Sequence, residues 1–513
     1  MSDSTATKPS APSTESAGTP QDKGLLSAGS LIMLTVVAVA SLRGLPAMSV
    51  YGLGSITLYV IPAIVFLVPT ALVAAELAVW RGGVYTWVRE AMGNRWGFTA
   101  IWLQWIQNVV WYPVQLAFCA AGIAYMILKP GLANSGLYTA ITILVFYWLA
   151  TLIALAGGNL FAKVSSWGGI IGTIIPGAIL IVLGVWWMST GHPSEISLKA
   201  STIIPPFTGL ASIVLIVSNF LAYAGMEMNA VHVNDMKEPK RFPFAILMAS
   251  LLILAIFIVP TISVGLVVPT KDTGLTTGIM EAFAKYFSAL GLGQWATVLI
   301  SGMIVIGALA GVVAWIAGPS KGLLLASRTG LLPVALQKRN AKGVQQGILV
   351  LQGIVVSLLA SLFLFSANVS AAFFALVDMA AALYLIMYMM MFASAIILRR
   401  TKPDVKRTYR VPMMNFVAGV GFLASAAGFV FSFVQSSQAS GGMSNATYGL
   451  LVAGVCVVLG APPLIFYAVK KPGWRTITDA EFASMVGDHA TPPSVHAAAE
   501  DAAAGAKNAG QRP

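Results

Sequence analysis

Apolar residues gather into twelve segments along this chain, separated by shorter polar connections. Each segment is close to or above the roughly 20 residues that a helix needs to cross a hydrocarbon core of about 30 Å. The pattern therefore predicts an all-α polytopic membrane protein with twelve transmembrane helices. The predicted spans are residues 31–54, 57–80, 98–128, 137–156, 168–188, 207–231, 243–268, 286–317, 347–366, 371–398, 411–434 and 447–469.

Basic residues lie mostly on every second connection between these segments. If both termini are cytoplasmic, 25 of the 30 Lys and Arg residues fall on the terminal segments and the even-numbered connections. Arg43 lies within the first span. Because cytoplasmic loops of membrane proteins carry an excess of Lys and Arg, we expect both termini in the cytoplasm. The residues left outside are Lys129, Lys199, Lys271 and Lys285.

Composition favours one membrane-embedded unit over several soluble domains. Apolar residues make up 58% of the 513 positions and charged residues 9%. The net charge of +12 follows from the topological bias and suits anionic lipid headgroups, so a lipid bilayer is the expected partner and nucleic acid is not. Both cysteines, Cys119 and Cys456, lie inside apolar spans without clustered His residues. We therefore expect no disulfide, metal site or cofactor.

The two polar ends of the chain, residues 1–26 and 478–513, are expected to be disordered cytoplasmic tails. The first is rich in Ser, Thr, Ala and Pro and lacks the charged and apolar regions of a signal peptide. The second is Ala-rich, and Phe482 is its one aromatic residue. Such a segment cannot bury enough apolar surface to fold by itself.

Two spans contain helix-breaking residues at matching places, which suggests an internal duplication typical of secondary transporters. The first span contains VASLRGLPA (39–47), and the sixth contains NFLAYAGMEMNA (219–230). Residues 27–188 and 189–398 would then be two five-helix repeats of opposite orientation. Two further helices, within residues 399–477, would follow them.

A helix break at membrane depth frees backbone polar groups, which need protein, water or a ligand as partners. Unpaired N–H groups suit a carboxylate, and the opposing carbonyls suit an ammonium group. Together these groups would bind an α-amino acid. The alternative is that Gly44 and Gly225 merely permit close packing of helices. Their symmetric placement favours the binding site.

Three longer patches carry a family resemblance: AAELAVWRGGVYTWVREAMGNRWGF (74–98), YAGMEMNAVHVNDMKEPKRFPFAI (223–246) and WIAGPSKGLLLASRTGLLP (315–333). Over about residues 31–475 the chain resembles the amino acid–polyamine–organocation superfamily, and within it the bacterial glutamate/γ-aminobutyrate antiporters. Many relatives in the superfamily have Gly-Ser-Gly in helix one, where this chain has Val39-Ala40-Ser41. The glutamate/γ-aminobutyrate branch also lacks those glycines.

The resemblance implies a five-plus-five inverted repeat, with helices one and six unwound at a substrate site. In the glutamate/γ-aminobutyrate antiporters the C-terminal tail also plugs the cytoplasmic opening until acid releases it, whereas the composition of this tail favours disorder. The breaks and the resemblance together give the candidate substrate-binding residues Ala40, Ser41, Arg43, Gly44, Tyr223, Ala224, Gly225 and Trp315.

Two charged residues inside the spans are candidates for function. Glu227, beside the break in the sixth span, is interpreted as a gating or proton-coupling residue, because intramembrane carboxylates are rare and functional. Its alternative role is to accept hydrogen bonds from freed backbone amides. Arg43 would cost about 2.5–3.5 kcal/mol at the membrane centre unless it is compensated. A substrate carboxylate, Glu227 or Asp378 could compensate it, and snorkelling or a fixed ion pair remains an equal alternative.

The aromatic residues and histidines add weaker expectations. Phe220 and Tyr384 should face the cavity, while Trp102, Trp105, Trp111 and Tyr112 are expected to pack between helices. His232 is more simply a capping or solvated residue than a pH sensor. His489 and His496 could gain charge as pH falls from about 7 to 5.

These features predict an amino acid transporter of the bacterial inner membrane that works by alternating access, most simply as an exchanger. A proton-coupled permease for neutral, aromatic or cationic amino acids or polyamines is the alternative. No GxxxxGK[ST] run is present to bind ATP. An enzyme would need polar clusters in long loops, which favours transport over catalysis, and a non-transporting amino acid sensor stays open. The sequence leaves monomer and homodimer equally open.

Overall fold

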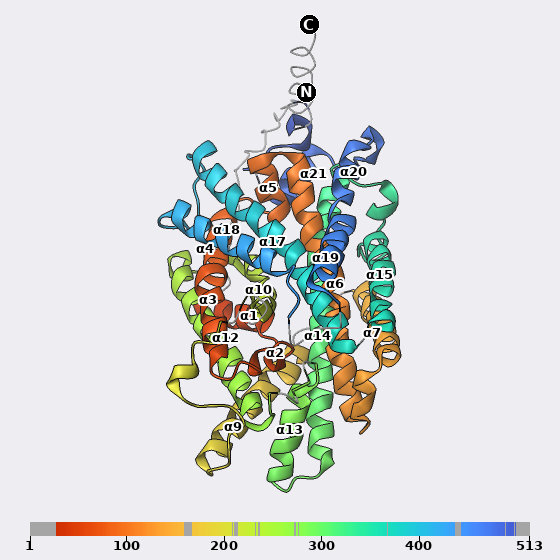
Figure 1. Ribbon diagram of the computed structural model, residues 1–513. Coiled ribbons are helices and arrows are strands. Elements are labelled where there is room, and N and C mark those ends of the chain that lie inside the picture. The colour runs from red at the N-terminus through yellow and green to blue at the C-terminus, as the bar shows by residue number, and fades with distance from the viewer. Residues whose placement is uncertain are drawn as a thin grey trace, which may run out of the picture.

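A computed structural model describes the fold, which is helical throughout its described part (Figure 1). Ten helices there are long and apolar enough to cross a membrane. The expected N-terminal tail, residues 1–26, lies outside the described residues. The structure describes residues 27–498 except 158–166, 208, 210–213, 231, 234–235, 271–272, 275, 367, 437–442, 488 and 497.

The first part of the chain folds into consecutive helices joined by short turns. Two π-helical turns, Ala63–Leu67 and Ile170–Ile174, continue neighbouring α-helices into the single long spans Gly54–Leu77 and Trp167–Ser189. The helices are α1 Ala28–Val39, α2 Leu45–Ser49, α3 Gly54–Pro62, α4 Val68–Leu77, α5 Val84–Met92, α6 Asn94–Met126, α7 Gly136–Ala156 and α9 Ile175–Ser189.

The rest of the chain continues as helices joined by further connections. Its helices are α10 Val217–Tyr223, α11 Met226–Ala230, α12 Phe242–Val267, α13 Gly278–Ala289, α14 Gln294–Arg328, α15 Gln346–Ala360, α16 Leu362–Phe365, α17 Val369–Thr401, α18 Met414–Phe431, α19 Asn445–Gly460, α20 Pro462–Ala468 and α21 Asp479–Val486. Short 3₁₀ turns occupy Pro130–Asn134, Ala200–Thr202, Val214–Ile216, Pro239–Arg241, Val334–Gln337 and Pro472–Trp474.

The predicted first and sixth spans are interrupted helices. The backbone leaves the helix at Ala40, whose ψ is 125°, and helix resumes as α2 with Pro46 in its first turn. In the sixth span α10 ends at Tyr223, and Gly225 takes a φ of 106° before α11 begins. A positive φ is readily adopted by glycine but strained for residues with a Cβ. The predicted breaks in both spans are therefore present.

One predicted span has different boundaries in the structure. The sequence placed the eighth span at 286–317, but the long helix α14 runs from Gln294 to Arg328. Residues 286–289 belong to the separate helix α13, which ends before Gly291 with a φ of 71°. Apolar residues of α13 and α14 are continuous in sequence, so hydropathy alone does not reveal the turn between them.

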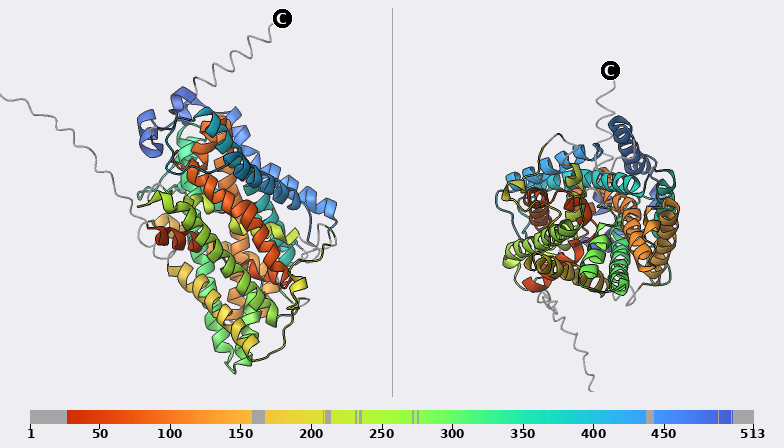
Figure 2. Two further views of the ribbon diagram at one scale, coloured as in Figure 1. Left: turned by 90° about the vertical axis from the view of Figure 1, so that its left-hand side faces the viewer. Right: turned by 60° about the horizontal axis from the view of Figure 1, so that its bottom comes forward.

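The long helices α6, α14 and α17 form the centre of the bundle, and both α14 and α17 pack along α6. The helices at the centre are more buried than those at the periphery. In the most apolar 18 residues of α6, 78% are buried, whereas in those of the span Asn445–Ala468 only 11% are buried. In Figures 1 and 2 the helices form one elongated bundle, with α5 and α21 at one end and α13 at the other. The end that carries α5 is called the α5 end below.

Part of the C-terminal segment, expected to be disordered, is folded onto the α5 end. Helix α21 begins with a capping box between Thr478 and Glu481. Phe482 is fully buried, with its ring 4.7 Å from the guanidinium carbon of Arg89. The backbone N–H of Thr491 donates to Glu90 at 3.0 Å. The segment finds on the transmembrane unit the apolar and charged partners that it lacks by itself.

Candidate functional site

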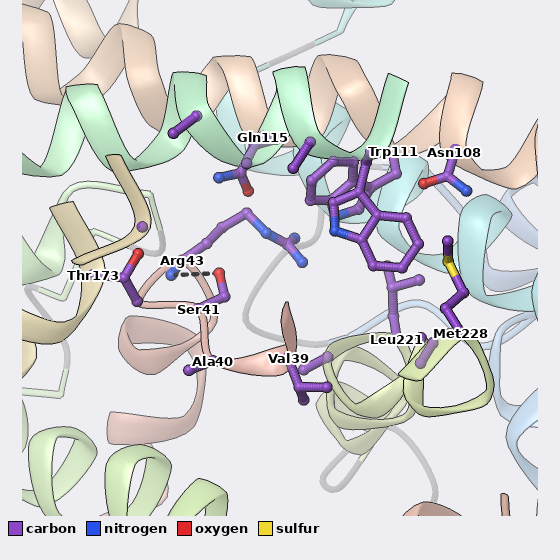
Figure 3. Close-up of a pocket in the computed structure, with 18 of the residues that line it drawn as sticks. Val39, Ala40, Ser41, Arg43, Asn108, Trp111, Gln115, Thr173, Leu221 and Met228 are labelled. Atoms are coloured by element: carbon purple, nitrogen blue, oxygen red, sulfur yellow. Dashed lines mark hydrogen bonds between the residues drawn. The ribbon is translucent and has the colours of Figure 1, made fainter. Parts of the chain in front are cut away.

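A cavity of about 340 Å³ lies at the centre of the bundle, where the two interrupted helices meet α6 and α14 (Figure 3). The broken segments contribute backbone and small side chains, which leave room for a ligand. The long helices contribute polar and aromatic side chains. Its lining includes Val39, Ala40, Ser41, Arg43, Gln107, Asn108, Trp111, Gln115, Thr173, Leu221, Ala224, Gly225, Met228, Trp315 and Tyr384.

Among the described residues that line this central cavity, Arg43 is the single cation. The residue is 6% exposed, and its Nε has no hydrogen-bond partner among the described residues. Its guanidinium carbon lies 6.0 Å from the ring centre of Trp111 and 5.8 Å from that of Phe373. Figure 3 shows the side chain extending across the cavity toward Trp111. A buried cation held by aromatic faces can still bind an anion.

Neither acidic residue considered as a partner for Arg43 pairs with it in the described structure. The Asp378 carboxylate instead accepts a short hydrogen bond from the Tyr448 hydroxyl. The Glu227 carboxylate instead accepts hydrogen bonds from the hydroxyls of Tyr384 and Tyr388. The positive charge in the central cavity is therefore not compensated by these two carboxylates.

Glu227 is 1% exposed and joins three helices through neutral donors. Oε1 accepts hydrogen bonds from the Tyr384 hydroxyl at 2.6 Å and from Gln104 at 2.9 Å. Oε2 accepts from the Tyr388 hydroxyl at 2.5 Å and from the backbone N–H of Gly225 at 3.1 Å. Glu227 thus accepts a hydrogen bond from a backbone N–H that the break leaves free, which is the alternative role considered in the sequence analysis. It also connects α11 to α6 and α17.

Most of the sequence-predicted substrate residues line the central cavity: Ala40, Ser41, Arg43, Ala224, Gly225 and Trp315. Gly44 instead lines a small adjoining cavity of about 20 Å³. Tyr223 is fully buried outside the central lining, and its hydroxyl donates to the carbonyl of Tyr59 at 3.0 Å. Tyr384 lines the cavity as expected, whereas Phe220 packs against Phe66.

One wall of the cavity was missed by the sequence analysis. Gln107, Asn108, Trp111 and Gln115 of α6 line it, although Trp111 was expected only to pack. Positions 107, 111 and 115 recur every four residues and therefore share one helix face. That spacing of polar residues within an apolar span is the signal that could have identified the wall.

A second cavity, of about 530 Å³, opens at the α5 end and is called the Arg81 cavity. Its lining includes Arg81, Lys321, His232 and Glu227. Met228 lines both cavities. Glu227 lines the Arg81 cavity, and its partner Tyr384 lines the central one. The hydrogen bond between these two side chains is therefore part of the partition between the cavities.

The described residues contain no group of three or more His, Cys, Asp or Glu side chains arranged to hold a metal ion. The candidate site instead offers one cation, several amides and aromatic faces. That chemistry is suited to non-covalent binding of a small zwitterion or anion.

Comparison with known proteins gives matches along most of the chain. An amino acid permease family model matches residues 26–459. An uncharacterized transporter of Legionella pneumophila is 38% identical, over 81% of this chain and 91% of that protein. A glutamate/γ-aminobutyrate antiporter of Lactococcus lactis is 30% identical, over 87% of this chain and 91% of that protein.

A solved structure also matches most of the chain. The crystal structure of MhsT in complex with L-phenylalanine aligns with a TM-score of 0.46 at 11% identity. The alignment covers 85% of this chain and 97% of MhsT.

Proposed function

Because this chain belongs to the amino acid permease family, we propose that it exchanges acidic amino acids across the bacterial inner membrane by alternating access. The proposal rests on Arg43. This buried cation lines the central cavity, and its Nε has no hydrogen-bond partner among the described residues. An acidic substrate would bring a second carboxylate to balance it. The 30% identity to a glutamate/γ-aminobutyrate antiporter supports the same substrate class and exchange.

In the proposed site, the two breaks and the α6 wall would contact different groups of the substrate. Arg43 would bind the side-chain carboxylate, since its planar fork suits bidentate pairing. Gln107, Asn108 and Gln115 would donate or accept the remaining polar contacts. Backbone groups or space for the substrate would come from Ala40, Ser41, Gly44, Ala224 and Gly225. Trp315 would cover the ligand, and Tyr223 would hold the break of the sixth span in place. The Gly225 N–H already donates to Glu227 and Tyr388, so we do not assign it to the substrate carboxylate.

Glu227 would act as the gate between the two cavities. Breaking its bonds to Tyr384 and Gln104 would separate α11 from α17 and α6 and open the partition. The repeats 27–188 and 189–398 would supply the two halves that rearrange around the site. Proton coupling is the second candidate, favoured by a buried carboxylate whose described partners are all neutral.

The test is uptake of radiolabelled glutamate by proteoliposomes containing the full chain. Exchange predicts rapid uptake only when the vesicles contain an amino acid, and glutamate should outcompete leucine. Uptake into empty vesicles driven by an imposed pH gradient would favour the proton-coupled permease instead. Lack of transport for every amino acid tested, from protein that still binds glutamate, would favour a sensor.

The proposed orientation places both termini, and with them the α5 end, in the cytoplasm. An epitope tag at either terminus should react with antibody only after the inner membrane of spheroplasts is permeabilised. Labelling of intact spheroplasts would contradict this orientation.

A further inference from the structure

The Arg81 cavity contains cationic groups for which the proposed exchange mechanism has no role. Arg81 lies in the turn between α4 and α5, and Lys321 lies on α14. Both residues are exposed and line the cavity. His232, next to the broken sixth span, lines it as well.

Lys321 is exposed, but it lies within α14 and not in the last turn of that helix. It precedes the end of α14, Arg328, by seven residues, which is a rise of about 10 Å along the helix axis. Small residues surround it in sequence, and Gly318 and Gly322 pack against Met228 and Ile101. The lysine therefore projects from a closely packed helix toward the cavity that it lines.

The carboxylates near this cavity are already bonded elsewhere. Glu227 is the acidic residue among the described lining, and four neutral donors bond to its two oxygens. Glu90, on the neighbouring helix α5, pairs with Lys402 and Arg89. Among the described residues, neither Arg81 nor Lys321 has an ion pair or hydrogen bond through its side chain. The described lining therefore has an excess of positive charge, with two cations against one carboxylate.

We propose that the Arg81 cavity is a second anion-binding site, in which Arg81 and Lys321 hold a carboxylate of the amino acid substrate before it passes the Glu227 partition. This identification of the anion rests on the proposed transport of acidic amino acids. Arg81 and Lys321 outnumber the one carboxylate of the lining, Glu227, and a cleft with an excess of positive charge concentrates an anionic ligand and raises its association rate. Since the cavity opens at the α5 end, its effect is confined to substrate that arrives from that side.

The central cavity and the Arg81 cavity together give a two-step path. Met228 lines both, and the Glu227 to Tyr384 hydrogen bond of 2.6 Å spans the partition. A ligand in the Arg81 cavity is thus adjacent to the gate without contacting Arg43. The two cations serve different steps: Arg81 and Lys321 act on entry from the α5 side, and Arg43 acts on binding at the centre.

The test compares the two faces of the membrane for Arg81→Gln, Lys321→Gln and the double variant of the full chain. Inside-out vesicles present the proposed cytoplasmic face to radiolabelled glutamate, and right-side-out vesicles present the opposite face. In the double variant we expect the KM at the cytoplasmic face to rise by about tenfold and to lose most of its salt dependence. The KM at the opposite face should stay within about twofold. Lys338→Gln is the matched control, an exposed lysine outside the cavity lining.

A binding measurement separates failure of this inference from failure of the proposed transport. Glutamate binding to purified Arg43→Ala protein reports on the Arg81 cavity with the central site weakened. Residual binding that disappears when Arg81→Gln and Lys321→Gln are added supports the second site even if transport is absent. The inference would be overturned if, at each face, the KM of the double variant equalled that of the wild type and the two substitutions left glutamate binding unaffected. Exchange itself would then remain intact.

Discussion

At the scale of single residues, Arg43 and Glu227 differ in how their charges are accommodated. Arg43 faces an open cavity and lies against aromatic rings, whereas Glu227 is surrounded by hydrogen-bond donors. A cation without a fixed partner can bind a ligand, and a fully bonded carboxylate holds helices together. Substitution of each residue should therefore affect a different step of transport.

Arg43→Ala should weaken binding of glutamate much more than binding of a neutral amino acid. A hydrogen bond to a charged group contributes about 1.5–3 kcal/mol, which corresponds to roughly a 10- to 100-fold loss of affinity. Competition by unlabelled glutamate and leucine measures both affinities in one preparation. Arg43→Lys keeps the charge without the bidentate fork and should lie between wild type and Arg43→Ala. An equal loss for both amino acids would assign Arg43 a structural role.

Glu227→Gln should slow exchange by about tenfold or more and change its pH dependence. The amide replaces one acceptor oxygen by an NH₂ group that cannot accept, so either the bonds from Tyr384 and Gln104 or those from Tyr388 and the Gly225 N–H are lost. Uptake between pH 5 and 8 measures both effects. Glu195→Gln, at an exposed position outside both cavities, is the control. An unchanged rate and pH profile would leave Glu227 without a gating or coupling role.

At the scale of elements, the two breaks differ in how strictly they require glycine. A Cβ at Gly225 would lie 2.6 Å from Trp315 Cη2, and the φ of 106° is unfavourable for any other residue. At Gly44 no atom lies within 4 Å of such a Cβ, and φ is −85°. Backbone conformation and packing therefore require glycine at position 225 in the sixth-span break. Neither of them requires glycine at position 44 in the first-span break.

Gly225→Ala should destabilise the protein and impair transport, because left-handed backbone costs an alanine roughly 1–2 kcal/mol before the clash with Trp315 is counted. Gly44→Ala is the matched control and should leave thermal unfolding in detergent nearly unchanged. The difference between the two melting temperatures is the measurement. Similar melting temperatures for both variants would contradict the distinction between the two breaks.

At the scale of the whole molecule, the C-terminal segment is held to the α5 end by the Glu90 carboxyl. Burial raises the pKa of Glu90, but the nearby His496 ring and the hydrogen bonds from Lys402 and Thr491 outweigh this effect and lower the pKa to about 2. A carboxyl with a lowered pKa stabilises the folded arrangement above its ordinary pKa of 4.5. That contribution is lost as pH falls from about 4.5 toward 2.

Glu90→Gln should therefore loosen the C-terminal segment at pH 7, where the wild-type carboxylate is charged. Hydrogen exchange of the α21 amides should become faster than in wild type, and the difference should shrink as pH approaches 2. Glu238→Gln, at an exposed ion pair with Arg241, should have no such effect. Identical exchange in wild type and Glu90→Gln would show that Glu90 does not hold the segment.

The sequence by itself determined the helical membrane architecture, the interruption of the first and sixth spans, and the candidates at those interruptions. Hydropathy depends on local composition, and Pro46 and Gly225 act on their own backbone, so these features need no tertiary information. The family resemblance came from three runs, of which 223–246 includes the interruption of the sixth span. The sequence could not place the turn between α13 and α14, because both sides of it are apolar.

Only the tertiary structure decided which side chains share a cavity and which charges are paired. Trp111 and Gln115 face Arg43 because α6 packs beside the broken segments, and Tyr223 turns away to bond Tyr59. The C-terminal segment folds onto the α5 end through contacts with Arg89 and Glu90, about 400 residues earlier in the chain. Burial and pairing are properties of neighbours that are distant in sequence, and a periodic pattern within one segment carries no information about them.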